Sequence, residues 1–257
     1  MASYTDLTRY RKCPRLHGFY SLGYTPPAKP EAMTTGLLVH AGLAAWFRNA
    51  DYRDALRAEV TKCLGQLSVI EDVIKHGQEC KAVGAAHSRA LQLLERYIAN
   101  WGKDYEAKLV ESSLELRGVT AHPDLVAFFH GERVLVDFKT SASPDVRYYD
   151  MSGQIDLYAY MLQELGSPVE RVIYDVISET GLFRHSRMPR LDSGRSLFMT
   201  LQGLSSLLAE DALNNPHVNY DCPNRCDYFL PCWLLETDDI AACRDYLEAN
   251  YIKGVER

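Results

Sequence analysis

The spacing of apolar positions divides the chain into a helical first part, a middle part of short strands and a helical end. Apolar residues recur every three or four positions over 32–47, which is the spacing of one face of an α-helix. Similar patterns predict helices over 51–66 and 84–105. A shorter helix is predicted over 3–10, because it begins with a serine and an aspartate spaced as in a capping box.

The middle part changes to the alternation and short apolar runs that are typical of strands. Strands are predicted over 108–117, 123–129, 133–138, 170–177 and 182–187. A helix over 149–164 precedes the fourth strand, a helix over 193–213 follows the fifth, and a last helix follows Thr237. Helices flanking a central group of strands predict an α/β or α+β domain with a mixed sheet.

The composition is that of a globular protein. A chain of 257 residues with 47% hydrophobic residues can bury a large core. No apolar run reaches the roughly 18 residues that span a bilayer, and the amino terminus lacks the apolar segment of a secretion signal, so we expect a cytoplasmic protein with no membrane partner. The net charge of −6 disfavours a protein that simply coats nucleic acid, but an enzyme whose carboxylates bind divalent cations remains open.

Two aspartates and a lysine carry the main candidate chemistry. Asp137 and Lys139 are two positions apart on a predicted strand, so their side chains share one face while Phe138 points into the core. A hairpin through residue 131 can bring Asp124 beside Asp137. Two carboxylates bind hard divalent cations, such an ion activates a water, and a nearby lysine can neutralise charge on a phosphate. An Asp–Lys pair that merely ends a strand is the structural alternative.

Three further residues complete a pattern that favours the chemical interpretation. His40 lies on a predicted helix and can supply a nitrogen ligand, and Gln154 and Tyr158 share one face of another. The ordered set resembles the RecB-type branch of the PD-(D/E)XK nucleases over residues 3–233. It consists of His40, Pro123-Asp124, Asp137-Phe138-Lys139 and Gln154-x-x-x-Tyr158.

The resemblance assigns a role to each member of this set. It implies that Asp124 and Asp137 bind the metal, together with His40 and the carbonyl oxygen of Phe138, and that Lys139 is the catalytic lysine. Gln154 and Tyr158 would hold the DNA backbone or the lysine. Glu111 also matches an acidic position of the family, but a solvated strand glutamate is our interpretation. A nitrogen among oxygen ligands shifts the preference from Mg²⁺ toward Mn²⁺, and we expect both ions to support activity.

Four cysteines form a second candidate site. Cys222, Cys226 and Cys232 fall within eleven residues, and Cys13 lies far upstream. Iron–sulfur nucleases of the RecB type, including AddB, the CRISPR-associated exonucleases and their phage relatives, carry one early and three late cysteines, which implies a 4Fe-4S cluster here. Their late spacing is two then five intervening residues, and here it is three then five, so zinc remains an alternative, as do four thiols without metal.

The resemblance also implies the organisation of the chain and its activity. We expect a single nuclease domain over 1–257 with a restriction-endonuclease-like core, a helical insertion over 48–106, and an iron–sulfur subdomain formed by 1–20 and 216–236. The expected function is metal-dependent DNA exonuclease activity, 5′ to 3′ on single-stranded or end-bearing DNA. Whether it serves repair and recombination, phage replication or CRISPR adaptation is left open.

Two alternatives share this fold, an endonuclease or flap nuclease and an inactive DNA-binding module. The sequence contains no helicase motor, so unwinding would need a helicase or recombination partner. The oligomeric state is left open.

Overall fold

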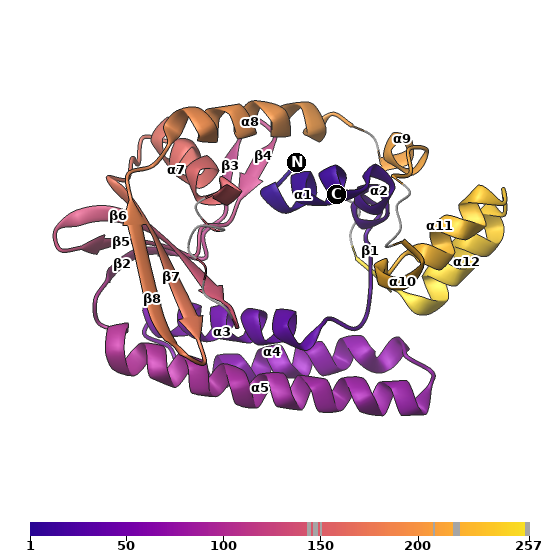
Figure 1. Cartoon of the computed structure of the whole chain (residues 1–257), viewed down its shortest axis with the longest axis horizontal. Coiled ribbons are helices and arrows are strands. Elements are labelled where there is room, and N and C mark those ends of the chain that lie inside the picture. Colours follow the sequence, from indigo (N-terminus) through magenta and orange to yellow (C-terminus); the bar gives the residue numbers. More distant parts are fainter. Residues whose placement is uncertain (143–144, 146–148, 150, 208, 218–221, 255–257) are drawn as a thin grey trace.

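The computed structural model describes residues 1–142, 145, 149, 151–207, 209–217 and 222–254, and the first part of the chain is mainly helical (Figure 1). In order, its elements are α1 (Tyr4–Lys12), α2 (Pro14–Ser21), β1 (Tyr24–Thr25), α3 (Glu31–Phe47), α4 (Tyr52–Gln66), the 3-10 helix η1 (Leu67–Val69) and α5 (Val73–Trp101). The three long helices α3, α4 and α5 pack against one another. None of the described helices is long and apolar enough to cross a membrane.

A five-stranded mixed sheet follows. Its strands, in sequence order, are β2 (Glu106–Val110), β5 (Leu125–Phe129), β6 (Glu132–Thr140), β7 (Arg171–Ser178) and β8 (Gly181–Arg187). They are adjacent in that same order, and β6 and β7 form the parallel pair while the other neighbours are antiparallel. A separate hairpin, β3 (Leu114–Leu116) with β4 (Val119–Ala121), lies between β2 and β5 in the sequence.

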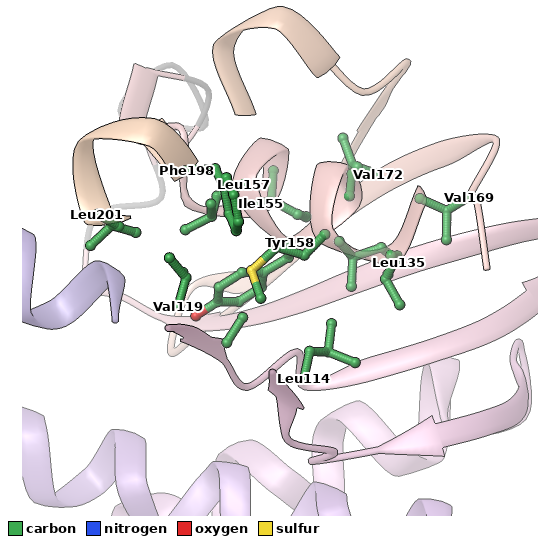
Figure 2. Packing of buried hydrophobic residues seen from close by; sticks show 14 of the residues in the cluster. Leu114, Val119, Leu135, Ile155, Leu157, Tyr158, Val169, Val172, Phe198 and Leu201 are labelled. Atoms are coloured by element: carbon green, nitrogen blue, oxygen red, sulfur yellow. The ribbon is translucent and has the colours of Figure 1, made fainter. Parts of the chain in front are cut away.

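Helices cover both faces of this sheet, because each central strand is apolar on both faces. On one face Val134, Val136 and Phe138 of β6 pack with residues of α3 and α5. On the other face Leu135 packs with α7 (Gln154–Glu164) and α8 (Leu191–Ser205). Figure 2 shows this second core, in which Ile155, Leu157 and Tyr158 of α7 lie among Leu135, Val172 and Phe198.

The C-terminal part returns to the beginning of the chain. It contains α9 (Ala209–Leu213), α10 (Cys222–Arg225), α11 (Phe229–Glu236), α12 (Ile240–Asn250) and β9 (Ile252–Lys253). β9 pairs antiparallel with β1, and the buried Tyr228 hydroxyl donates to the Tyr24 carbonyl oxygen at 2.6 Å. Phe19 and Tyr228 stack within the same small core. The two ends of the sequence therefore form one unit (Figure 1).

The fold class predicted from the sequence is confirmed, but several boundaries were wrong. α5 begins at Val73 instead of 84. The predicted strand over 108–117 is broken, because Glu111 adopts a left-handed backbone (φ 46°) and the chain turns into the β3–β4 hairpin. The predicted helix over 193–213 is divided into α8 and α9. The predicted helix over 149–164 is interrupted at Gly153: residues 149, 151 and 152 are helical, α7 starts at Gln154, and residue 150 lies outside the described residues.

Candidate active site

The centre of the site is on β6. Asp137 is 3% exposed, and its Oδ2 lies 2.7 Å from Lys139 Nζ. Burial raises the pKa of Asp137 to about 6, although Lys139 opposes the shift. Burial also acts to lower the pKa of Lys139, but attraction to Asp137 and Asp124 outweighs it and leaves that pKa raised. The lysine is therefore held as a buried cation beside a carboxylate.

Asp124 reaches β6 from the residue before β5. Its Oδ2 accepts a hydrogen bond of 2.7 Å from the Phe138 amide, which lies between Asp137 and Lys139 in the sequence. Its Oδ1 lies 3.3 Å from His40 Nδ1. Burial acts to raise the pKa of Asp124, but the His40 and Lys139 charges and these hydrogen bonds hold it below its usual value. Asp124 is thus ionised and fixed beside the lysine strand.

His40 and Glu111 complete a group of metal-ligand atoms. One ligand atom each from His40, Glu111 and Asp124 lie within 4.8 Å of one another, and Glu111 Oε1 is 3.8 Å from His40 Nδ1. Burial acts to lower the pKa of His40, but Asp124 and Glu111 raise it to about 10. The carboxylates therefore attract positive charge strongly at this point. Glu111 is exposed, as expected of a solvated glutamate, yet its carboxylate joins the group.

The beginning of α7 places Gln154 beside the lysine and Tyr158 beside Gln154. Gln154 Oε1 lies 3.3 Å from Lys139 Nζ, and Gln154 Nε2 donates to the Tyr158 hydroxyl at 2.8 Å. The two residues share one helix face because they are four apart. Burial raises the pKa of Tyr158 to about 12, so this phenol stays neutral. A chain of polar contacts thus runs from Asp137 through Lys139 and Gln154 to Tyr158.

A buried aspartate fixes α7 from its other face. Asp156 is fully buried and accepts hydrogen bonds from Arg187 Nη1 at 2.7 Å and from the Arg190 amide at 2.9 Å. α8 approaches the same turn so closely that a Cβ atom on Gly194 would lie 2.2 Å from the Asp156 carbonyl oxygen. These contacts set the position from which Gln154 reaches Lys139.

The opposite wall of the site is α3. Gly36 lies one helical turn before His40, and a Cβ atom built on Gly36 would meet Thr140 Oγ1 at 3.1 Å. Thr140 directly follows Lys139 on β6. A side chain at position 36 would therefore push the helix away from the strand, so the glycine allows His40 to approach Asp124.

The four cysteines line one cavity, far from β6 in sequence. Cys13, Cys222, Cys226 and Cys232 are among the residues that line a cavity of about 250 Å³, and none of the four forms a disulfide. The His217 amide donates to Cys13 Sγ at 3.4 Å, and Arg15 Nη1 donates to Cys232 Sγ at 3.2 Å. Burial raises the pKa of the Cys226 thiol. The cavity thus brings together four cysteines, and N–H groups donate to the sulfur atoms of two of them, which suits thiolate ligands of a metal or cluster.

Comparison with known proteins agrees with this geometry. The family model described as PD-(D/E)XK nuclease superfamily matches residues 1–232. The chain belongs to the PD-(D/E)XK nuclease superfamily. No curated protein matches it. Among solved structures, one titled "Crystal structure of SSO0001" shares 18% identity, covers 61% of this chain and 81% of that one, and superposes with a TM-score of 0.31, so the assignment rests on the family match.

As a PD-(D/E)XK nuclease, the protein is a metal-dependent enzyme that acts on DNA. Its donor set fits a divalent cation, because oxygen atoms predominate and one imidazole is added. His40, Glu111 and Asp124 supply the three close ligand atoms. Asp137 lies beside them and pairs with Lys139. A metal contact by the Phe138 carbonyl stays a prediction; the Phe138 amide bonds to Asp124.

Three residues of the site were not among the catalytic and metal-binding residues predicted from the sequence: Gly36, Glu111 and Asp156. The spacing Gly36-x-x-x-His40 could have indicated Gly36, because residues four apart share a helix face. Glu111 matches an acidic position of the family, but the alternating pattern predicts a solvated strand glutamate there. The residue lies directly after β2 with a left-handed backbone, which an alternating pattern does not predict. Asp156 lies between two apolar residues on α7, and its arginine partners come from beyond β7, so the sequence carried no local signal for it.

Proposed function

We propose that this PD-(D/E)XK nuclease is an exonuclease that degrades single-stranded DNA from 5′ ends in the cytoplasm. The observation that supports nuclease chemistry is the meeting of the His40–Glu111–Asp124 group with the Asp137–Lys139 pair. Direction and strandedness rest on the resemblance of the ordered residue set to RecB-type nucleases. In this proposal, a partner with helicase or recombination activity supplies the single strand. The free thiols suit a reducing compartment.

In this proposal, each residue of the site has its own role in the hydrolysis of a phosphodiester bond. His40, Glu111 and Asp124 would hold a divalent cation, which would supply a water of lowered pKa and offset charge on the phosphate. Lys139 keeps its proton and directs its positive charge at the oxygens on which negative charge builds. Gln154 and Tyr158 limit the rotation of the lysine side chain through their hydrogen bonds. Asp137 keeps the ammonium group next to the metal ligands.

The test is cleavage of linear and circular single-stranded DNA, labelled at either end, with Mn²⁺ present. We expect the wild-type protein to degrade linear strands alone and to release the 5′ label first. Asp137→Asn should abolish this activity with little change in side-chain size. Glu164→Gln, which changes an exposed carboxylate of α7, is the matched control and should cut like the wild type.

Other outcomes separate the alternatives. Cutting of the circular strand would indicate an endonuclease with the same centre. Absence of cleavage by folded, metal-loaded wild-type protein would contradict the enzyme and favour a DNA-binding module. Equal cutting by wild type and Asp137→Asn would remove Asp137 from the mechanism.

We further propose that the four cavity cysteines bind a 4Fe-4S cluster that joins the ends of the chain. The support is their common cavity and the donors to two sulfur atoms. Closing a loop of about 200 residues restricts the unfolded chain, so the role is structural.

The test of the cluster is metal content and visible absorbance of anaerobically purified protein. Brown protein with about four irons and four sulfides per chain is expected. Cys226→Ser should lose the colour, and Cys80→Ser, outside the cavity, should keep it. Colourless protein with stoichiometric zinc would contradict the cluster and favour the zinc alternative.

A further inference from the structure

The turn that precedes α7 is held by a tyrosine near the amino terminus. The Tyr4 hydroxyl, on α1, donates a hydrogen bond to the Ser152 carbonyl oxygen. Ser152 is followed by Gly153, which has a left-handed backbone (φ 72°), and then by Gln154. A Cβ atom on Gly153 would lie 2.8 Å from Leu197 of α8. The carbonyl group that Tyr4 holds is therefore two residues from the glutamine that contacts Lys139.

The same turn is bounded by the catalytic sheet on its other side. Tyr174 of β7 is aligned with Asp137 of β6 and is 1% exposed. Burial raises the pKa of Tyr174 to about 12, so this phenol stays neutral beside the turn. Ser152 itself is held through its carbonyl oxygen by Tyr4, which α1 carries.

α1 is a short, well-anchored helix that ends at the cysteine cavity. Its capping box is complete, with the Ser3 amide donating to Asp6 Oδ2 at 2.9 Å. Ala2 before it exchanges backbone hydrogen bonds with Gly118 and Thr120. The Cys13 amide, at its end, donates to the Arg9 carbonyl oxygen at 2.8 Å. Helix α1 therefore links Cys13 directly to the Tyr4 contact, because nine helical residues move as one rod.

We propose that Tyr4 is a positioning residue through which metal bound at the four-cysteine cavity stabilises the catalytic arrangement of Gln154 and Lys139. A metal that holds Cys13 fixes one end of α1, and Tyr4 passes this restraint to the Ser152–Gly153 turn. Loss of the metal removes the restraint at the Cys13 end of α1, while the Ala2 hydrogen bonds remain, and so increases the motion of Tyr4, of the turn and of Gln154. The coupling is reciprocal, since a free energy that links two sites acts in both directions. The catalytic readout of this proposal rests on the proposed nuclease function.

The first experiment compares Tyr4→Phe with Tyr10→Phe in the metal-loaded full chain. Both tyrosines are half-buried on α1 and pack on the same core, but Tyr4 donates to Ser152. We expect Tyr4→Phe to speed amide hydrogen exchange over 154–158 and to lower kcat about tenfold. The KM for DNA, the cavity metal content and the Tm should stay unchanged. Tyr10→Phe should match the wild type in every measurement.

The second experiment removes the cavity metal with a chelator and then restores Mn²⁺ at the catalytic site. In the wild type, removal should speed exchange over 154–158. In Tyr4→Phe, removal should add little, because the link is already broken. Equal additional exchange in both proteins would overturn the coupling, as would wild-type exchange in metal-loaded Tyr4→Phe. A general fall in Tm and metal content would show that Tyr4 supports the fold and does not position the turn.

The two proposals fail in different ways. If the wild type cuts no DNA, the proposed function is wrong, while hydrogen exchange still decides the coupling. If the wild type is active and exchange over 154–158 does not respond to Tyr4→Phe, the coupling is wrong and the proposed function stands.

Discussion

At the scale of single residues, the catalytic centre depends on charges that are buried together. Asp137 and Lys139 pair at 2.7 Å, while Asp124 pairs with His40 at 3.3 Å. Each carboxylate would be costly to bury alone, and each has a cation beside it. These ion pairs stabilise charges that lie close together inside the protein. At an exposed site, solvent would stabilise the same charges. Removing one member therefore changes the protonation of the others as well as the chemistry.

Lys139→Ala tests this dependence. Without the ammonium group, the effect of burial on Asp137 is less opposed and the pKa of Asp137 rises further, because Lys139 is the group that lowers it most. We expect kcat to fall by a factor of about 100 to 1,000, the range found when one donor to a transition-state charge is removed. Steady-state cleavage of labelled single-stranded DNA measures it. Lys103→Ala, at an exposed position, is the control, and activity retained after Lys139→Ala would remove the lysine from the mechanism.

At the scale of elements, the site is a contact between α3, β6 and α7. The β6 pattern could be predicted from sequence, because Val134, Leu135 and Val136 mark a strand buried on both faces and Asp137 continues its alternation. The close approach of α3 to that strand was not predicted, although the spacing Gly36-x-x-x-His40 could have indicated that a side chain at position 36 would meet Thr140. The break before α7 was also missed, because it depends on the left-handed backbone of Gly153 and on the arginine partners of Asp156, which lie far along the chain.

Gly36→Ala should separate α3 from β6. The new methyl group would meet Thr140 Oγ1 at 3.1 Å, so the helix or the threonine must shift by a few tenths of an ångström. We expect Mn²⁺ to bind about tenfold more weakly, because a shift of His40 lengthens one ligand bond, and isothermal titration calorimetry measures this. Thr140→Ala in the same chain should restore most of the affinity.

The matched control is Gly84→Ala on α5, where an added Cβ atom has no neighbour within 4 Å. It should stabilise the protein by about 1 kcal/mol and leave Mn²⁺ binding unchanged. If Thr140→Ala fails to rescue Gly36→Ala, the contact with Thr140 is not the reason for the glycine.

At the scale of the whole molecule, a buried network attaches the helices to the sheet. Asp175 of β7 is fully buried and pairs with Arg184 of β8 at 2.7 Å. The hydroxyl groups of Tyr97 on α5 and Tyr105 before β2 donate to it at 2.8 and 2.9 Å. The family resemblance does not predict this network, because its members are spread over 88 positions and share no motif.

Asp175→Asn should destabilise the protein by about 3 to 5 kcal/mol, the usual cost of leaving one member of a buried ion pair without its partner. The amide would also present hydrogens to the two tyrosine hydroxyls. Urea unfolding followed by tryptophan fluorescence gives the free energy of unfolding. Asp245→Asn, at an exposed position of α12, should change it by less than about 0.5 kcal/mol. A similar small change for Asp175→Asn would show that the network adds no net stability.

The joining of the two chain ends has a consequence for synthesis on the ribosome. The first helices emerge first, yet Arg15 bonds to Leu213 and Glu236, and Tyr24 accepts from Tyr228. Their partners are synthesised about 200 residues later, so the packing of α1 and α2 is completed only after the core has begun to fold. A nascent chain stalled before residue 213 should be cut by protease within residues 1–30, while the same segment of the released protein resists.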